Sequence, residues 1–501
     1  MREEPRRRAG AVLRAGIPDD DNRHYLPEHL KGTSIVVNEN GNNSQPYPSR
    51  LERRSGAIVD AAMNTWYVYV PESYDPSVAS PLVVSLHGGL MTGWGQAVYS
   101  SWTNVADREG FVVVFPDAAS RRFWTIDIAP GRIAEMTAPN PEGLYLNPPP
   151  RDPSANHDIS LIRGVIDWAS VEYAIDAERV FLHGMSMGEA MTSTFVRRFG
   201  YLLAGAAGSG APIDADLLFD DRGGVVNTGG PLPMWQSRLD LDEGPQSFAT
   251  QGAELVRQNR DYWLRVNEID DPPAISILGV DNFAFYSGGR ADVVFRDVHG
   301  RDHGQTFDDA EFVWDYFFSG LRRRTDGSIA STPPELARTG DALALAVADG
   351  RPLAWVHGER VVLPTPAFIW EAAQYHGRGG ARVVRKRLVY VPLSFLASVL
   401  GGHLTTGEEG SVAVLELPDG RVLQFARGVI GCVLDGRVRS MSAEAVLRDG
   451  HLCVSFEWFT AAVLDLHVSE HSGVVYATDH FAQLSANMAF LLADLLDGVT
   501  T

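Results

Sequence analysis

The amino-acid sequence predicts an α/β fold with a doubly wound, mostly parallel sheet and a second, smaller α+β domain at the C-terminus. Near-continuous apolar runs are typical of strands buried on both faces, as in PLVVSLHGG (81–89), GFVVVFPDA (110–118) and RVFLHG (179–184). Helical patterns such as ISLIRGVIDWASVEYAI (159–175) lie between these runs. Strands and helices that alternate in this way form βαβ units.

The predicted strands and helices of this α/β domain lie within residues 56–322. Residues 1–55 are polar and are predicted to form an irregular arm. The stretch WYVYVPESY (66–74) is predicted to be a strand. Two later candidate strands, PLPMWQS (231–237) and ADVVFRDV (291–298), precede a helical pattern at 307–320.

A change of pattern marks the second domain. Residues 323–341 are polar, contain Pro-Pro and show no periodicity, so we predict a linker there. Residues 342–480 form a domain with a faint internal repeat, because VPLSFLASVLGGHL (391–404) resembles VSFEWFTAAVLDLHV (454–468). Each copy predicts a strand end, a short helix and a return strand. Residues 481–501 are predicted to form a C-terminal helix.

Composition limits the classes of partner. The net charge is −20, which disfavours nucleic acid and anionic membranes because both would be repelled. No apolar run approaches the roughly 18 residues that span a bilayer. The N-terminus lacks the apolar segment of a signal peptide. Cys432 and Cys453, the two cysteines, form no disulfide framework, and two buried thiols or one bridge remain open.

Gly184-Met185-Ser186-Met187-Gly188 lies between a buried strand and a helical stretch. A nucleophile elbow requires this strand–turn–helix context, because glycines let the backbone turn sharply and present the serine hydroxyl. Isolated G-x-S-x-G matches arise often by chance, but this context predicts that Ser186 is a nucleophile.

A serine nucleophile needs a base and an acid, which follow it in the chain in this fold. His303 follows the strand at 291–298 and is our candidate base, with His299 as its rival. The acid is expected after the strand at 231–237. There Asp242 is preferred over Asp240, and Glu243 is a third carboxylate.

The oxyanion donors are predicted to be the backbone N–H groups of Met187 and Gly89, the latter in the His87-Gly88-Gly89 turn. His299 and His303 form an H-x-x-x-H pair, but they flank a turn and lack a third ligand. No metal site is predicted.

Together these motifs resemble the esterases related to poly(3-hydroxybutyrate) depolymerases, feruloyl esterases and acetylxylan esterases, which is carbohydrate esterase family one. The resemblance covers roughly residues 60–320. It rests on WTNVADREGFVVVFP (102–116), DISLIRGVIDW (158–168), HGMSMGEAM (183–191) and GRDHGQTF (300–307), besides the strands above. It implies hydrolysis of carboxylic esters by Ser186, His303 and an aspartate, without a metal or organic cofactor. It also suggests an extracellular enzyme.

Three departures from the family pattern stand out. Met187 stands where the family usually has a small or amide residue, and Glu189 stands where it usually has glycine. Arg238-Leu239-Asp240-Leu241-Asp242 stands where the family often has a histidine-glycine-x-x-Asp pattern. A Pro-rich stretch at 125–156 is long enough to shape a substrate cleft. Candidate aromatic residues for stacking on substrate, with core packing as the alternative, are Trp94, Trp102, Trp124 and Tyr145.

The C-terminal domain resembles the small repeat domain named after the N-terminal part of copper amine oxidases. The matching stretches include LVYVPLSFLASVLGG (388–402), DGRVLQFARG (419–428) and HSGVVYAT (471–478). No histidine cluster has copper-ligand spacing, so copper is not implied. Such domains look like attachment or interaction modules.

The leading interpretation is a serine esterase that acts on short-acyl, polyester, or feruloyl or acetyl polysaccharide esters. The alternatives are a peptidase or acyltransferase on the same fold, and a catalytically inactive binding protein. The last is motivated by Glu189, whose charge would oppose an oxyanion unless it points away. The oligomeric state and the acyl specificity stay open.

Overall fold

The chain folds into two units in a computed structural model that describes residues 28–32, 48–120, 122–141, 143–242, 252–374 and 382–498. The N-terminal unit comprises Met1–Asp271, Phe285–Arg296 and Arg301–Arg338. The C-terminal unit comprises Pro272–Ala284, Asp297–Gly300 and Thr339–Thr501. The boundary at 338/339 lies within the predicted linker range, but the C-terminal unit also takes two short segments from residues predicted to belong to the first domain.

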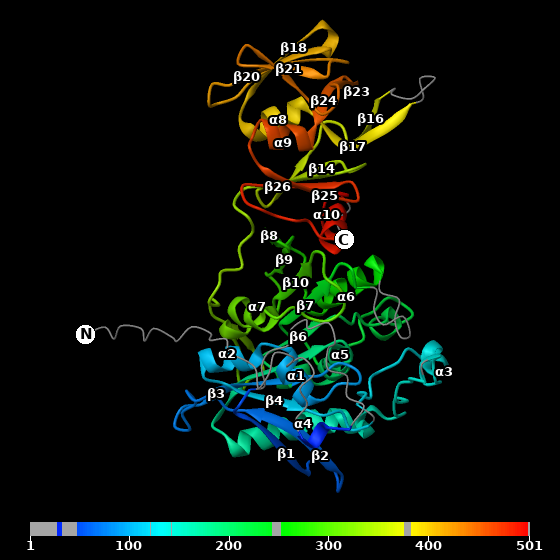
Figure 1. The fold of residues 1–501 in the computed structure, drawn as a ribbon, viewed down its shortest axis with the longest axis vertical. Helices are drawn as coiled ribbons and strands as arrows, with labels where there is room; N and C mark the ends of the chain where they lie inside the picture. Colours follow the sequence, from blue (N-terminus) through cyan, green and yellow to red (C-terminus); the bar gives the residue numbers. More distant parts are fainter. Residues whose placement is uncertain are drawn as a thin grey trace, which may run out of the picture. The chain divides into compact units, whose positions relative to one another are not determined.

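A mostly parallel sheet forms the centre of the N-terminal unit (Figure 1). Its strands are β1 Leu51–Ala57, β2 Met63–Tyr69, β3 Ser80–Leu86, β4 Val112–Pro116, β5 Ile175–Met185, β6 Gly205–Ser209, β7 Met234–Leu239 and β10 Val293–Val298. They belong to a ten-stranded sheet of the described residues, in which they lie in the order β1-β2-β4-β3-β5-β6-β7-β10. The pairs from β4 to β7 are parallel, whereas β1 and β2 are antiparallel to their neighbours. The predicted mostly parallel sheet is confirmed.

Helices alternate with these strands. They are α1 Gly93–Tyr99, α2 Trp102–Glu109, α3 Ile133–Met136, α4 His157–Glu172, α5 Met187–Phe199, α6 Ala253–Val266 and α7 Asp309–Tyr316. The side chain of Asn156 caps α4 by accepting from the N–H groups of Asp158 and Ile159. Gly164 allows α4 to approach Ile58 closely, since a Cβ at this glycine would lie 2.1 Å from the Ile58 side chain.

Two of these eight strands were not predicted from the sequence. β6 reads GAAGS, a composition with poor strand propensity, and it is identified only by its place between β5 and β7. β1 begins within the predicted arm, at Leu51, and pairs with β2 along its whole length. It is an edge strand with mostly exposed, polar residues, so no apolar alternation marks it. Residues 1–27 and 33–47 of the predicted arm lie outside the described residues.

The predicted linker contains a hairpin. Its strands are β11 Leu321–Arg323 and β12 Ile329–Ser331, which pair antiparallel. The turn between them uses Asp326, whose carboxylate accepts from the N–H of Ser328, and Gly327, whose φ is 84°. This hairpin was not predicted, because an Asp-Gly turn closes it without any apolar pattern in its strands.

Antiparallel sheets dominate the C-terminal unit, which also holds α8 Leu393–Leu400, α9 Phe456–Ala462 and α10 Ala486–Leu495. The sheets have the orders β15-β14-β13-β26-β25, β16-β17-β24-β23 and β18-β19-β20-β21-β22. The strands of these three sheets are β13 Ala344–Ala348, β14 Leu353–Val356, β15 Glu359–Val362, β16 Phe368–Gln374, β17 Val383–Pro392, β18 His403–Gly407, β19 Val412–Glu416, β20 Val422–Ala426, β21 Gly431–Leu434, β22 Arg437–Ser440, β23 Val446–Arg448, β24 His451–Ser455, β25 His467–His471 and β26 Val474–Thr478. Two further strands, β8 Ala274–Leu278 and β9 Asp281–Tyr286, belong to the ten-stranded sheet. The C-terminal helix is shorter than the predicted 481–501, and residues 499–501 lie outside the described residues.

The internal repeat has a direct structural counterpart. One copy runs from β17 through α8 to β18, and the other from β24 through α9 to β25. β17 and β24 pair antiparallel, and Val391 lies opposite Val454, the residue with which it aligns in the repeat. Equivalent residues that face each other across an antiparallel pair are related by a local twofold axis.

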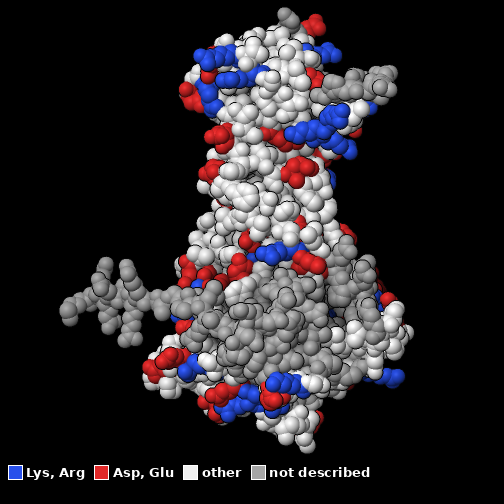
Figure 2. All heavy atoms as spheres, in the orientation of Figure 1, with Lys and Arg blue, Asp and Glu red and all other residues white. Residues whose placement is uncertain are grey.

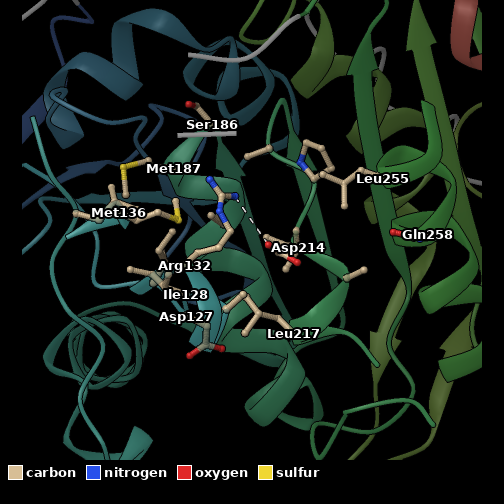
Figure 3. A pocket seen from close by; sticks show the side chains of 18 of the residues that line it. Asp127, Ile128, Arg132, Met136, Ser186, Met187, Asp214, Leu217, Leu255 and Gln258 are labelled. Carbon is tan, nitrogen blue, oxygen red and sulfur yellow. Dashed lines mark ion pairs between the residues drawn. The ribbon is translucent and has the colours of Figure 1, made fainter. Parts of the chain in front are cut away.

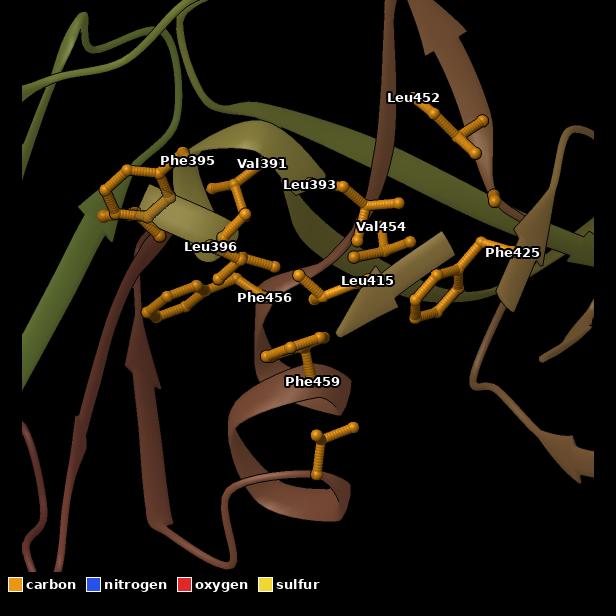
Figure 4. Close-up of a cluster of buried hydrophobic side chains, with 14 of the residues drawn as sticks. Val391, Leu393, Phe395, Leu396, Leu415, Phe425, Leu452, Val454, Phe456 and Phe459 are labelled. Atoms are coloured by element: carbon orange, nitrogen blue, oxygen red, sulfur yellow. The ribbon is translucent and has the colours of Figure 1, made fainter. Parts of the chain in front are cut away.

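The two copies share one aliphatic and aromatic core (Figure 4). Phe395 and Leu396 come from α8, and Phe456 and Phe459 come from α9. Cys432 and Cys453 are both buried and are not joined by a disulfide. No helix among the described residues is long and apolar enough to cross a membrane. Figure 2 shows acidic and basic side chains interspersed over the visible face.

Phe459→Ala tests the importance of this core. Phe459 is fully buried, so we expect the substitution to lower the free energy of unfolding of the C-terminal unit by about 3–5 kcal/mol. Denaturant titration followed by fluorescence measures this loss. Phe490→Ala is the matched control because Phe490, in α10, is 43% exposed. Equal losses in the two variants would contradict the assignment of the core.

Candidate active site

The backbone turns sharply at Ser186, which has a positive φ. Ser186 links the end of β5 to the start of α5 and has φ of 53° and ψ of −122°. Two glycines permit this turn. A Cβ at Gly184 would lie 2.1 Å from the carbonyl oxygen of Gly188, and a Cβ at Gly188 would lie 2.2 Å from that of Leu86. Any larger side chain at either position would push β3, β5 and α5 apart.

The hydroxyl of Ser186 is within hydrogen-bond distance of His303, the predicted base. Its Oγ lies 2.8 Å from Nε2 of His303, and Nδ1 of His303 lies 3.0 Å from each carboxylate oxygen of Asp242. Asp242 is 1% exposed and His303 is 29% exposed. The hydrogen bonds therefore run from a buried carboxylate through an imidazole to a half-exposed hydroxyl.

The rival residues occupy other places. Asp240 and His299 supply none of the hydrogen bonds that join Ser186, His303 and Asp242. The N–H of His299 donates to the carbonyl of Val280, at the base of the loop that carries His303. Glu243 lies outside the described residues. No group of three metal-binding side chains occurs among the described residues.

Backbone contacts hold the three loops together. The N–H of Ser186 donates to the carbonyl of Ser209, and the hydroxyl of Ser209 donates to the carbonyl of Gly304. The N–H of Leu241 donates to the carbonyl of Arg301. Ser209 therefore links the loop of Ser186 to the loop of His303. Sequence reasoning missed it because β6 had no recognisable strand pattern.

Gly304 allows the loop that carries His303 to adopt its backbone conformation and to approach Tyr99 closely. Its φ is 130°, a region that side chains rarely adopt, and a Cβ there would lie 2.1 Å from the hydroxyl oxygen of Tyr99. Tyr99 belongs to α1 and packs with Met91 and Met185. Tyr99 therefore lies against both the loop that carries His303 and Met185, the residue that precedes Ser186.

The turn of Gly88 and Gly89 is fixed by the buried ring of His87. The ring accepts at Nε2 from the N–H of Ala118 at 3.0 Å, so its Nδ1 carries the proton and donates to the carbonyl of Gly88 at 2.6 Å. Trp124 donates from its indole to the carbonyl of His87 at 2.8 Å. Because C=O and N–H point in opposite directions across a trans peptide, this arrangement turns the N–H of Gly89 away from His87.

Gly89 and Met187, the predicted donors, lie close together. A Cβ on Gly89 would lie 3.2 Å from the sulfur of Met187. Met187 is the first residue of α5, where backbone N–H groups have no helical partner and the helix dipole is positive. The backbone N–H of Met187 is therefore well placed to stabilise negative charge next to Ser186.

Glu189, the unusual residue after the elbow, points into the protein. It is 3% exposed, and its two carboxylate oxygens accept from Nη1 of Arg238 at 2.8 and 3.0 Å. The N–H of Ala211 also donates to it, at 2.5 Å. Burial raises the pKa of Glu189, and the charge of Arg238 acts in the opposite direction. The two departures from the family pattern, Glu189 and Arg238, are therefore one ion pair.

Gly208 makes room for this pair. A Cβ on Gly208 would lie 2.4 Å from Cγ of Glu189, so only glycine leaves room for this side chain at that position of β6. Nε and Nη2 of Arg238 are buried without a hydrogen-bond partner among the described residues. Removal of the Glu189 carboxylate would leave this guanidinium buried without its counter-charge.

The predicted aromatic residues do not reach the cavity beside Ser186. Trp94, Trp102 and Trp124 are at most 2% exposed and belong to the core, and none of them lines that cavity. The prediction that Trp94 and Trp124 contact substrate is corrected, because a fully buried indole has no free face. Tyr145 is half-buried and is not among the lining residues either. The stretch 125–156 nevertheless supplies part of the cavity wall, including Ile128 and Met136.

Comparison with known proteins gives distant relatives. No family model matches the chain. The bifunctional acetylxylan esterase/xylanase XynS20E of Neocallimastix patriciarum is 24% identical over 255 residues, which are 50% of this chain and 32% of the relative. Acetylxylan esterase A of Emericella nidulans is 28% identical over 224 residues, which are 44% of this chain and 60% of the relative. The chain thus spans less than two thirds of the length of either.

Solved structures of esterases are also similar to this chain. An acetyl xylan esterase from Aspergillus awamori is 17% identical, with 54% of this chain and 99% of that chain covered and a TM-score of 0.38. A thermostable esterase is 18% identical, with 50% and 56% covered and a TM-score of 0.34.

Glu189→Gln tests the buried ion pair. We expect it to lower the free energy of unfolding by about 3–5 kcal/mol, since it leaves the charge of Arg238 buried without compensation. The double variant Glu189→Leu/Arg238→Leu should lose less than this, because both charges are gone. Denaturant titration measures both.

Glu52→Gln provides the control for this pair. It removes the carboxylate from an exposed ion pair with Arg54 and should cost less than about 1 kcal/mol. If Glu189→Gln is as stable as Glu52→Gln, the buried pair has no structural role.

His87 gives a pH-dependent prediction. Burial lowers the pKa of His87 to about 4 from 6.5, so the folded protein holds the ring neutral. Between these values a falling pH protonates the unfolded chain but not the folded protein, and about 3 kcal/mol of stability is lost. Burial raises the pKa of Asp117 to about 6, which opposes this trend in the whole protein.

The prediction is therefore tested on the difference in unfolding free energy between wild type and His87→Gln. The destabilisation caused by His87→Gln, measured by denaturant titration, should shrink by about 3 kcal/mol from pH 7 to pH 4. A destabilisation that stays constant over this range would contradict a buried, neutral His87.

Proposed function

We propose that the N-terminal unit is a serine carboxylic-ester hydrolase in which Ser186 is the nucleophile, His303 the general base and Asp242 the acid that orients it. The observation that carries this proposal is the continuous set of hydrogen bonds from Asp242 through His303 to Ser186. The named relatives, which are acetylxylan esterases, support the same class of reaction.

The reaction would proceed through a covalent acyl-enzyme. Nε2 of His303 takes the proton of Ser186 as its Oγ attacks the ester carbonyl carbon. The N–H groups of Gly89 and Met187 stabilise the resulting oxyanion, each by about 3 kcal/mol. His303 then protonates the departing alcohol. A water molecule, deprotonated by His303, attacks the acyl-enzyme and releases the acid and Ser186.

Asp242 would hold the imidazole of His303 in the required tautomer. With Nδ1 donating to the carboxylate, Nε2 is left free to accept from Ser186. The charge of Asp242 also stabilises the imidazolium that forms during the reaction. Glu189, the reason for considering an inactive protein, has Arg238 as its counter-charge and is buried, which favours the active interpretation.

The substrates proposed from the resemblance are short-acyl, polyester, and feruloyl or acetyl polysaccharide esters. The C-terminal unit is proposed to be a repeat domain like that of copper amine oxidases, with an attachment or interaction role. The facing of Val391 and Val454 supports a duplicated unit of this kind.

Hydrolysis of a panel of p-nitrophenyl esters by wild type and Ser186→Ala tests the reaction. We expect the substitution to remove nearly all turnover, since it removes the nucleophile. A fluorophosphonate probe should label wild type and fail to label Ser186→Ala. Turnover of amides but not esters would support a peptidase. An unlabelled wild type without turnover would support an inactive binding protein.

Asp242→Asn and Asp240→Asn separate the two candidate acids. The first should lower kcat by roughly 10⁴-fold, as expected when the histidine adopts the wrong tautomer. The second is the same chemical change two residues away and should alter kcat by less than about threefold. The reverse ranking would overturn the assignment of Asp242.

A further inference from the structure

A cavity of about 490 Å³ lies beside Ser186 (Figure 3). Ser186 and His303 both line it, so an ester bound at the hydroxyl would extend part of its structure into this space. A volume of this size is typical of a small-molecule site. An acetyl group has a single methyl and would leave most of the cavity to water.

Aliphatic side chains make up most of the wall. They come from the stretch after Trp124, from the first turns of α5 and from the loop after β6, and α6 closes one side. These apolar residues are Ile126, Ile128, Ala129, Met136, Leu146, Met187, Ala190, Ala211, Pro212, Ile213, Ala215, Leu217 and Leu255.

The charged side chains of the wall are already paired within the protein. Nη1 of Arg132 lies 3.8 Å from the carboxylate of Asp214, an ion pair drawn in Figure 3. Asp127 pairs with Arg197 and Arg198, and Glu254 pairs with Arg257. A charged group on the substrate would have to compete with these contacts, so they do not favour an anionic or cationic ligand.

Aromatic rings are missing from the described part of the wall, apart from the imidazole of His303. Planar aromatic groups gain binding energy from offset or edge-on contacts with other rings, beyond the area they bury. An aliphatic wall supplies burial alone, which increases with each methylene. The cavity is therefore suited to a flexible hydrocarbon chain.

We propose that this cavity binds the aliphatic chain of a medium-length ester, of roughly four to eight carbons, in preference to acetyl or feruloyl groups. This inference rests on the proposed function, because it concerns the ester that Ser186 attacks. The aliphatic chain belongs either to the acyl group or to the alcohol of the ester. A hydrocarbon chain from either source would make the same contacts in this cavity.

Two series of esters test the proposal and separate these sources. In the first, p-nitrophenyl acetate, butanoate, hexanoate and octanoate share one alcohol. In the second, ethyl, butyl, hexyl and octyl acetates share one acyl group. In the series whose chain enters the cavity, kcat/KM should rise about fourfold per methylene, which corresponds to 0.8 kcal/mol. p-Nitrophenyl ferulate should be a poorer substrate than the hexanoate.

Leu217→Trp locates this preference in the cavity. The indole would fill space beside Leu217, and we expect the ratio of kcat/KM for octanoate to that for acetate, or for octyl to ethyl acetate, to fall at least tenfold. Leu336→Trp is the matched control, because Leu336 lies outside the cavity wall and is 42% exposed. It should leave the ratio unchanged.

The outcomes are distinct. A kcat/KM that is highest for acetyl and ethyl esters, or highest for ferulate, would overturn the aliphatic-chain proposal while the esterase function stands. A rising series that Leu217→Trp does not affect would overturn its placement in this cavity. Failure of every ester together with an unlabelled Ser186 would instead overturn the proposed function.

Discussion

The positive-φ backbone at Ser186 is the constraint on which the N-terminal unit depends. A non-glycine residue in such a conformation stores roughly 1–3 kcal/mol of strain, which the surrounding packing must hold. Here β3, β5 and α5 approach so closely that only glycine fits at 184 and 188. The strained turn presents the hydroxyl at the N-terminus of α5, and the loops of His303 and Asp242 are arranged around it.

Buried polar groups keep these loops in place. Ser209 connects the serine and histidine loops, the neutral ring of His87 sets the Gly88–Gly89 turn, and the Glu189–Arg238 pair joins α5 to β7. Each of these groups lies beneath the surface, where a hydrogen bond or ion pair is costly to break. The half-exposed side chains of Ser186 and His303 are thus supported by polar contacts that solvent does not reach.

The C-terminal unit uses a different principle, the duplication of a strand–helix–strand element. Its two copies face each other across β17 and β24 and enclose a common core between α8 and α9. A single copy would leave the apolar face of its helix exposed, so the two halves are stable only together. This requirement explains why the repeat is strongest at residues such as Val391 and Val454, which face each other, and in the helices that follow them.

The sequence by itself determined most of the parallel strands, the elbow at Ser186, and the order of the candidate serine, aspartate and histidine, because local patterns carry each of them. Only the tertiary structure places Asp242, and not Asp240, in hydrogen-bond contact with His303, because two residues of a turn differ in where they point. It also placed Trp94 and Trp124 in the core and joined Glu189 to Arg238, 49 residues apart. β6 likewise went unpredicted, because its GAAGS composition has poor strand propensity, and Gly208 within it is required by the neighbouring Glu189 side chain. Contacts between distant segments depend on the packing of the whole unit, and no local pattern records them.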